Sequence, residues 1–222
     1  MVNSLRILGC YSGTGGYGRY PSSQYLIINN KSYLIDCGEG TQFLLKKYKI
    51  KFSSIDNIFI SHLHGDHYFG LPGLISYYNL NFHELECKNT EIINNDEILV
   101  KTLKLKHRIP CTGFLFQSKK ISDISYAYCS DTAYNEELSL LVKDVNILYH
   151  ESTFLSLHKD LAVKTKHSTA IEAGKIASKA NVSKLILGHF SSRYNDLNEF
   201  KKESSSVFKN TFIAEEGKIY SF

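Results

Sequence analysis

Short runs of apolar residues recur along the chain at strand length and predict a protein rich in β-structure. Residues 5–10, 25–28 and 32–36 form the first block of such runs. The Asn-Asn pair between the second and third run favours a tight hairpin, because asparagine tolerates the left-handed backbone that these turns need. Further predicted strands cover residues 58–61, 98–105, 114–117, 126–129, 145–149 and 184–187, and another strand ends the chain.

Three segments interrupt this strand pattern with spacing typical of helices. In residues 40–48, three apolar side chains including Phe43 are predicted to face inward and the following lysines outward. Residues 168–180 open with a Thr-x-x-Glu capping box, and residues 197–207 predict a more polar helix. Since strands dominate and helices occur singly, we expect an α/β sandwich in which two sheets face each other under outer helices.

Length and composition fit one globular domain. The 222 residues are 43% hydrophobic and 22% charged, and no Pro-, Gly- or Ser-rich linker divides them, so we expect a single domain over residues 1–222. The apolar run at residues 7–10 is too short for a signal peptide, and no stretch is long enough to span a membrane, so a cytoplasmic protein is expected. The net charge of +4 is compatible with an anionic substrate without requiring one. Five cysteines without a CxxC pair predict reduced core residues.

Metal-competent side chains follow five of the predicted strands. In layered α/β folds, ligand and catalytic groups gather at the carboxyl ends of strands, so residues far apart in sequence can converge there. The five residues in these positions are His62, His107, Asp131, His150 and His189.

The densest group of such side chains is the run from His62 to His67, with the sequence HLHGDH. Four potential ligands in six residues cannot all face one way on a strand or helix, so the run predicts a loop. A chance match to this pattern is expected in about 6 of 10,000 chains of this composition. Imidazole and carboxylate without thiolate suit Zn²⁺, with Mn²⁺ or Fe²⁺ as alternatives.

The loop alone does not complete a two-metal site, since each ion needs about three protein ligands. His62 and His64 can hold one ion, and Asp66 with His67 the other. The side chains that can complete the two ions come from distant strand ends, with the last of them bridging: His107, His189 and Asp131.

With these motifs in place, the chain resembles the metallo-β-lactamase superfamily and, within it, the ribonuclease Z branch. The narrower resemblance rests on six segments from residue 36 to 194, namely DCGEGTQ, HRIPCTGF, SDT, HESTF, HSTA and HFSSRY. It implies a four-layer αββα sandwich and matches the seven ligands above. It also implies a homodimer and a phosphodiesterase that cleaves at the 3′ end of precursor tRNA with a metal-bridging hydroxide.

Two departures from the family pattern affect the substrate more than the chemistry. Only 23 residues separate His107 from Asp131, so the protruding arm with which many relatives grip tRNA is absent, and the chain resembles a short form. Many members also carry an acidic residue three positions before the bridging aspartate, where it orients a catalytic histidine. Tyr128 occupies that position here.

The resemblance suggests roles for residues around the metals. Asp66 is predicted to take or orient the proton of the attacking water, and His167 of the HSTA motif to protonate the leaving ribose oxygen. The alternative for His167 is a surface residue beside a helix. His150 is predicted to orient a ligand or Asp131, with a buried structural histidine as the alternative.

Substrate contacts are predicted near the last metal ligand. Ser191 and Arg193 would bind a substrate phosphate, against the alternative that Arg193 forms a surface salt bridge. The lysine-rich stretches at residues 46–51 and 101–106 could follow an RNA strand or be solvated faces. The glycine-rich segment 13–16 lacks the end of a P-loop and instead resembles the family's first loop beside the metals.

Three alternative functions are open. The first is a hydrolase of small phosphodiesters or other esters, since the arm is missing. The second is a di-iron oxidoreductase on the same fold, although such enzymes typically carry Glu where this chain has His64. The third is a binding protein that has lost catalysis, against which the complete set of seven ligands argues.

Overall fold

The computed structural model describes residues 2–14, 18–76 and 80–222. The chain forms two compact units. Unit 1 comprises residues 1–86 and 215–221, and unit 2 comprises residues 87–214 with residue 222. The expectation of one domain over residues 1–222 stays a prediction. Among the described residues, no helix is long and apolar enough to cross a membrane.

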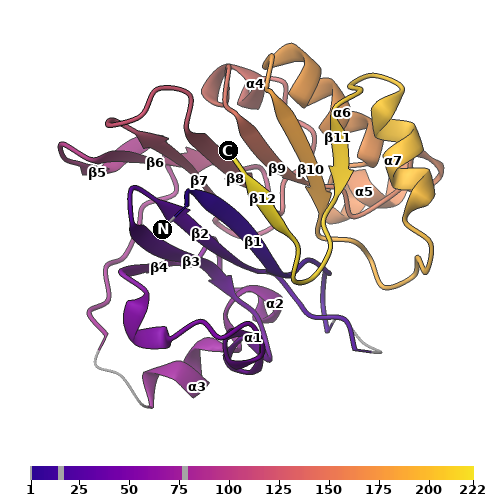
Figure 1. The fold of residues 1–222 in the computed structure, drawn as a ribbon. Coiled ribbons are helices and arrows are strands. Elements are labelled where there is room, and N and C mark those ends of the chain that lie inside the picture. The colour runs from indigo at the N-terminus through magenta and orange to yellow at the C-terminus, as the bar shows by residue number, and fades with distance from the viewer. Residues whose placement is uncertain (1, 15–17, 77–79) are drawn as a thin grey trace. The chain divides into compact units, whose positions relative to one another are not determined.

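Unit 1 contains a five-stranded sheet in the order β12-β1-β2-β3-β4 (Figure 1). Its strands are β1 (Ser4–Gly9), β2 (Ser23–Ile28), β3 (Lys31–Cys37), β4 (Asn57–Phe59) and β12 (Ile219–Ser221). β3 and β4 are parallel and the other neighbours antiparallel. The predicted hairpin is confirmed, because Asn29 and Asn30 adopt φ angles of 52° and 63° between β2 and β3.

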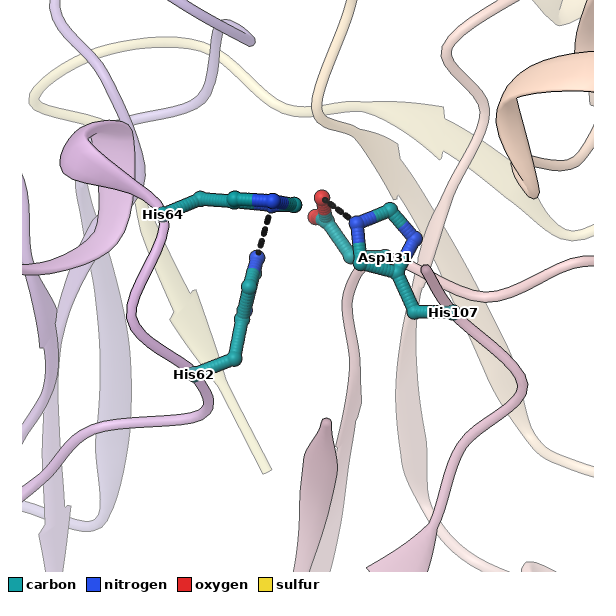
Figure 2. A group of neighbouring side chains, drawn as sticks. All are labelled: His62, His64, His107 and Asp131. Carbon is teal, nitrogen blue, oxygen red and sulfur yellow. Dashed lines mark hydrogen bonds and ion pairs between the residues drawn. The ribbon is translucent and has the colours of Figure 1, made fainter. Parts of the chain in front are cut away.

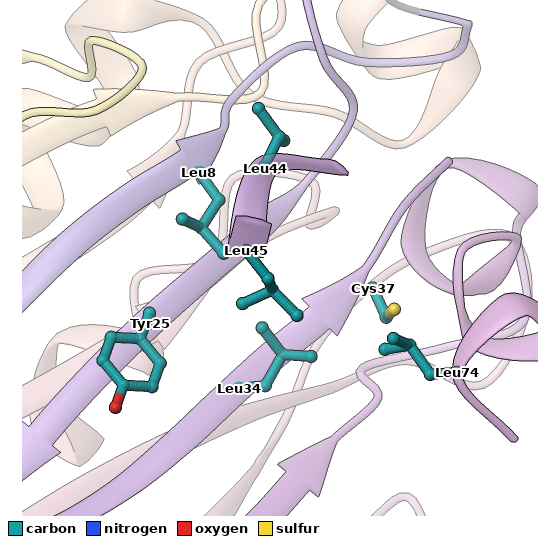
Figure 3. Packing of buried hydrophobic residues seen from close by; sticks show 7 residues of the cluster. All are labelled: Leu8, Tyr25, Leu34, Cys37, Leu44, Leu45 and Leu74. Atoms are coloured by element: carbon teal, nitrogen blue, oxygen red, sulfur yellow. The ribbon is translucent and has the colours of Figure 1, made fainter. Parts of the chain in front are cut away.

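One helix of unit 1 covers the core that the sheet provides. Leu44 and Leu45 of α1 (Thr41–Lys47) belong to a buried cluster with residues from β1, β2 and β3 (Figure 3). The prediction that Phe43 faces inward is wrong, since its side chain is 63% exposed. The helical repeat turns about 100° per residue, so the face that buries Leu44 and Leu45 leaves Phe43 outside. The remaining helical segments are η1 (Phe52–Ser54), α2 (Gly65–Tyr68) and α3 (Leu71–Ile75).

Unit 2 contains a seven-stranded sheet in the order β11-β10-β9-β8-β7-β6-β5 (Figure 1). Its strands are β5 (Thr90–Asn94), β6 (Ile98–Lys104), β7 (Thr112–Ser118), β8 (Ser125–Cys129), β9 (Ile147–Glu151), β10 (Lys184–Gly188) and β11 (Thr211–Ile213). β5 to β8 pair antiparallel, whereas β8 to β11 pair parallel. The carboxyl ends of β8, β9 and β10 therefore meet at one edge of the sheet.

Helices of unit 2 pack against the parallel half of its sheet. α6 (Ala170–Lys179) contacts β9 and β10, and α7 (Asn198–Ser205) packs on α6 and β11. The capping box that opens α6 is confirmed, because Thr169 and Glu172 exchange their hydrogen bonds. The shorter helical segments are α4 (Leu138–Leu141), η2 (Ser156–His158) and α5 (Lys159–Thr165).

Several elements carry weak sequence signals. β5 is an edge strand without a buried residue, and α3, α4 and α5 are each only a turn or two long. Neither kind of element shows a periodic apolar face over enough residues to be recognised. The cysteines match their prediction, since all five are reduced thiols and four of them are buried, with Cys87 partly exposed.

Candidate active site

The four candidate ligands of unit 1 lie between β4 and the end of α2. His62 precedes the turn, His64 caps α2 with an extended backbone, and Asp66 and His67 lie in the helix itself. The predicted loop therefore ends in one helical turn that starts at Gly65. His62 Nε2 and His64 Nδ1 lie 2.9 Å apart, with their rings nearly perpendicular at 81° (Figure 2). Two ring nitrogens at this separation suit neighbouring ligands of one cation.

A buried carboxylate that the sequence analysis missed orients this loop. Asp36, near the end of β3, is fully buried and accepts a hydrogen bond of 2.6 Å from Nδ1 of His67. It also accepts hydrogen bonds from the backbone amide and the hydroxyl of Ser61, at 2.7 and 2.9 Å. Asp36 adopts a φ angle of 57°, a left-handed conformation that aspartate tolerates better than most residues. Its place at the start of DCGEGTQ was the available signal.

Asp66 has a different environment from the buried histidines. Its side chain is 14% exposed and lies 3.6 Å from Nε2 of His67. It also accepts a hydrogen bond of 2.8 Å from the backbone amide of Gly13. The segment 13–16 thus contacts Asp66 through its first residue, while Gly15 and Gly16 lie outside the described residues. This restrains one oxygen of a partly accessible carboxylate.

In unit 2, Asp131 presents its two oxygens to two different rings. Oδ1 lies 3.1 Å from Nε2 of His189, and Oδ2 lies 3.5 Å from Nε2 of His107; Figure 2 shows the second contact. Asp131 follows β8 after one intervening residue, His189 follows β10 directly, and the two adopt left-handed φ angles of 60° and 57°. The burial of all three side chains and the division of the carboxylate between two imidazoles match what a bridging ligand requires.

The candidate acid His167 lies beside these ligands in unit 2. Ligand-competent atoms of Asp131, His167 and His189 all lie within 4.8 Å of one another. The His167 ring stacks on that of His189 at 5.3 Å and contacts that of His107 at 5.0 Å. Only 9% of His167 is exposed, so a surface role is excluded. The HSTA motif therefore places an imidazole against two candidate ligands.

Glu151 holds His167 and was missed in the sequence analysis. Its Oε1 accepts a hydrogen bond of 2.7 Å from Nδ1 of His167. Burial acts to lower the pKa of His167, but the charge of Glu151 and this hydrogen bond outweigh it and raise the pKa to about 9. Burial likewise acts to raise the pKa of Glu151, and the charge of His167 outweighs it, so the pair is held as carboxylate and imidazolium.

The remaining contacts of Glu151 tie it to the neighbouring motifs. It accepts hydrogen bonds from the backbone amides of Thr132, Thr153 and Ser168, at 2.8, 3.1 and 3.1 Å. Tyr128, at the position where the resemblance predicts an acidic residue, is fully buried and stacks on Tyr149. Tyr128 has no carboxylate with which to orient a histidine. Glu151 therefore orients His167 in its place.

The candidate imidazole ligands share one arrangement that suits metal binding. In four of them Nδ1 lies within hydrogen-bonding distance of an oxygen, so Nε2 is the ring nitrogen that would bind a cation. The four pairs are His62 with Ser61 Oγ at 3.0 Å, His67 with Asp36, His107 with the Lys166 carbonyl at 3.1 Å and His189 with Thr153 Oγ1 at 2.9 Å. Burial lowers the pKa of His107, more strongly than Asp131 raises it, and so favours the neutral form that a metal requires.

Three further candidates show their local contacts. His150 lies inside β9 rather than after it, and its Nδ1 donates to the carbonyl of Glu151 at 2.7 Å. Burial lowers its pKa, so the ring is neutral. The hydroxyl oxygen of Ser191 accepts a hydrogen bond of 3.4 Å from the backbone amide of Arg193. Arg193 is exposed and lies over the Phe154 ring at 5.8 Å, and no acidic group within the described ranges forms an ion pair with it.

Comparisons with known proteins identify the family. The family model described as "Anti-Pycsar protein Apyc1" matches residues 4–93. Ribonuclease Z of Cytophaga hutchinsonii is 37% identical, over 97% of this chain and 95% of the relative. That alignment spans 297 positions, more than the 222 residues here, so the relative carries residues without a counterpart in this chain.

Solved structures confirm the fold. Human tRNase Z, short form, superposes with a TM-score of 0.82 at 26% identity over 98% of both chains. The metallo-β-lactamase-fold protein YhfI of Bacillus subtilis gives a TM-score of 0.83 at 18% identity over both full chains. The predicted α/β fold of the metallo-β-lactamase type is thereby confirmed. The chain belongs to the ribonuclease Z family, and the enzyme is a metal-dependent hydrolase of the endoribonuclease class.

Proposed function

We propose that this protein is a zinc-dependent phosphodiesterase of the ribonuclease Z type that cleaves precursor tRNA at its 3′ end and leaves a 3′-hydroxyl. The proposal includes two Zn²⁺ ions, with Mn²⁺ or Fe²⁺ as alternatives. The observation that carries it is the environment of His167. An imidazolium held by a buried carboxylate, next to candidate metal ligands, suits the protonation of a poor leaving group.

The donor chemistry of both units fits this metal pair. Neither ligand set completes two sites by itself, since a catalytic zinc uses about three protein ligands. We assign to one ion His62, His64, His107 and one oxygen of Asp131, and to the other Asp66, His67, His189 and the second oxygen of Asp131. The oxygen-bound Nδ1 atoms and the divided contacts of Asp131 support this assignment. When bound, such a pair polarises a phosphoryl group and makes water acidic enough to attack near neutral pH.

The residues of the chain then divide the proton transfers between them. Asp66 is partly accessible and has one restrained oxygen, so it can orient the attacking water and accept its proton. As the bond from phosphorus to the ribose 3′-oxygen breaks, that oxygen takes a proton from Nε2 of His167. Glu151 accepts the hydrogen bond from Nδ1 of His167 and stabilises the imidazolium until the proton is transferred. Ser191 and Arg193 are assigned to a substrate phosphate, which the absence of an ion pair between Arg193 and any described acidic residue supports.

The test is an assay with two substrates and a metal determination. Protein purified without chelator should contain close to two equivalents of transition metal, mostly zinc. It should cleave a 3′-extended precursor tRNA at one position, and product mapping should find a 3′-hydroxyl on the tRNA fragment. One equivalent of metal or none in active protein would refute the metal pair, and failure to cleave any precursor tRNA would refute the substrate.

A hydrolase of small phosphodiesters or other esters is the second candidate, and one observation favours it. The 23 residues between His107 and Asp131 form only the β7–β8 hairpin and its flanking turns, so no arm extends from this segment. A protein of this kind would hydrolyse bis-p-nitrophenyl phosphate rapidly and leave every precursor tRNA intact. The same two-substrate assay therefore separates the two functions.

The proposal also covers assembly and location. We propose a homodimer in the cytoplasm, which the family resemblance supports. Light scattering coupled to size-exclusion chromatography should give twice the mass of the 25.3 kDa chain. Fractionation of cells should recover the protein with cytoplasmic markers.

A further inference from the structure

Unit 2 contains an open cavity of about 580 Å³ whose lining includes several basic residues. Four basic residues line it together with the candidate ligand His107, namely Lys104, Lys106, Arg108 and Lys166. Leu105, Ile109 and Pro110 add an apolar surface. The volume lies in the range of pockets that hold small ligands, and a mixed basic and apolar lining suits a group that combines phosphate with a sugar.

Most of these charges are not neutralised by the protein. Lys104, Arg108 and Lys166 form no ion pair with any acidic group in the described part of the chain. Lys106 donates to Asn135 and lies 3.9 Å from the exposed Glu137.

Some lysines elsewhere in unit 2 are neutralised by acidic partners. Lys101 lies 3.1 Å from Glu91, and Lys120 and Lys179 are paired with Glu97 and Glu136. Clustered cations without counter-charges repel one another, so the cavity is poised to accept anions.

The cavity adjoins the groups assigned to chemistry. His107 lines it, and its Nδ1 donates to the carbonyl of Lys166 at 3.1 Å. Lys166 adopts a left-handed conformation with φ 60° at the end of α5 and directly precedes His167. A single residue thus orients a candidate ligand with its backbone and contributes a charge to the cavity wall. An anion held in the cavity would lie beside the candidate ligand His107.

We propose that this basic cavity binds a backbone phosphate of the RNA strand adjacent to the scissile bond. The inference rests on the proposed function, because it assumes a polynucleotide at the metal centre. It assigns Lys104, Arg108 and Lys166 to substrate binding and gives the protein a grip on RNA that needs no arm. Within the lysine-rich stretch 101–106, the proposal excludes Lys101 from RNA binding, since Lys101 is ion-paired and does not line the cavity.

The experiment compares two triple variants with equal charge change in the full-length, metal-loaded protein. The cavity variant is K104Q/R108Q/K166Q, and the control variant is K119Q/K120Q/K202Q, which neutralises exposed lysines outside the cavity. Both carry His167→Ala, which slows cleavage of the substrate during the measurement. The dissociation constant for 3′-extended precursor tRNA is measured over a salt series. Circular dichroism and metal content verify that each variant is folded and loaded.

We expect the cavity variant to bind RNA roughly tenfold more weakly or worse, and the control to bind like the parent. The dependence of log K on log salt should become shallower by about 0.7 for each RNA phosphate that the variant no longer neutralises. Equal affinity and slope for the two variants would overturn the proposal, as would a parent protein that binds no RNA at low salt. If the protein with His167 intact binds precursor tRNA without cleaving it, the proposed function fails while the binding comparison still decides the role of the cavity.

Discussion

The two units present their candidate ligands in opposite ways. In unit 1, His62, His64, Asp66 and His67 lie within six consecutive residues on a turn that runs into α2. In unit 2, the candidate ligands His107, Asp131 and His189 follow three different strands, β6, β8 and β10. Of these, β8 and β10 are both parallel neighbours of β9. A local turn gathers the first set, whereas the order of strands in the sheet gathers the second. The first can be read from a motif, and the second depends on topology.

The two units nevertheless use the same device to fix an imidazole. A buried carboxylate at the end of a strand accepts a hydrogen bond from Nδ1, at 2.6 Å from His67 to Asp36 and at 2.7 Å from His167 to Glu151. We assign His67 to a metal and His167 to proton donation. The comparison teaches that the carboxylate alone does not set the role of the imidazole, which depends on what its Nε2 faces.

The largest effect is expected from removing Asp131, the carboxylate of unit 2 whose two oxygens contact two different imidazoles. Asp131→Ala should lower the metal content below that of Asp66→Ala, because Asp131 faces two imidazoles and we assign Asp66 to one ion only. Both variants should lose activity on bis-p-nitrophenyl phosphate by roughly a thousandfold, since two-metal activation supplies several kcal/mol. Elemental analysis and kcat measure the two quantities. An Asp131→Ala protein with two equivalents of metal and more than about a tenth of kcat would contradict the bridging role.

A smaller and more selective loss is expected at His167. General acid catalysis contributes about 10²–10⁴-fold where the leaving group is a poor one such as a ribose oxygen. His167→Ala should therefore reduce precursor tRNA cleavage by that order and hardly affect bis-p-nitrophenyl phosphate, whose nitrophenolate departs without a proton. Metal content should stay at the parent value. Equal loss on both substrates, or loss of metal, would instead show that His167 is a metal ligand, as we assign His67 to be, or a structural residue.

Exchanging the two buried carboxylates for amides tests the comparison directly. Asp36→Asn should weaken metal affinity by about 10–100-fold, as expected for a group that orients a ligand. Glu151→Gln should leave metal affinity closer to that of the parent and reduce RNA cleavage, because His167 loses its partner.

The pH dependence of cleavage separates the same two variants. Glu151 raises the pKa of His167 to about 9, and the acid works only while protonated, so activity falls as pH rises through that pKa. Without the charge the pKa drops, and the alkaline limb for RNA cleavage should move to lower pH in Glu151→Gln but not in Asp36→Asn. If the alkaline limb lies at the same pH in the two variants, Glu151 does not set the pKa of the acid in a way that Asp36 does not.

The sequence predicts ligands better than the groups that orient them. HLHGDH is dense enough to stand out from chance, and most of the strands found in the structure are recognisable from apolar runs. Asp36 and Glu151 belong to the DCGEGTQ and HESTF segments, but a single carboxylate beside a strand does not by itself indicate that it orients an imidazole. Their roles arise only when the fold brings an imidazole within 2.7 Å, that of His67 from α2 and that of His167 from the segment between α5 and α6. His150 shows the reverse, since its position beside a strand end suggested chemistry while the structure buries it inside β9.

The basic cavity illustrates the same limit. Lys104 and Arg108 are near each other in sequence, but Lys166 is far from them and comes to the cavity wall through the end of α5. Charge counting along the chain also cannot separate Lys101 from Lys104, since only the structure pairs the former with Glu91. Ion pairing, which depends on tertiary packing, decides which cations are available to a substrate.

The smallest effect is expected from the cap of the helix that follows His167. α6 begins with a reciprocal capping box between Thr169 and Glu172, whereas α1 of unit 1 begins after Gly40 without a side-chain cap. Thr169→Ala should therefore destabilise the fold by about 1 kcal/mol. The exposed Ser178→Ala in the same helix is the matched control and should be close to neutral. Urea unfolding measures both. Because Glu151 and the amide of Ser168 still hold the HSTA segment, RNA cleavage by Thr169→Ala should fall only a few-fold, with unchanged metal content. A loss as large as that of His167→Ala would show that the cap, rather than Glu151, fixes the position of the candidate acid.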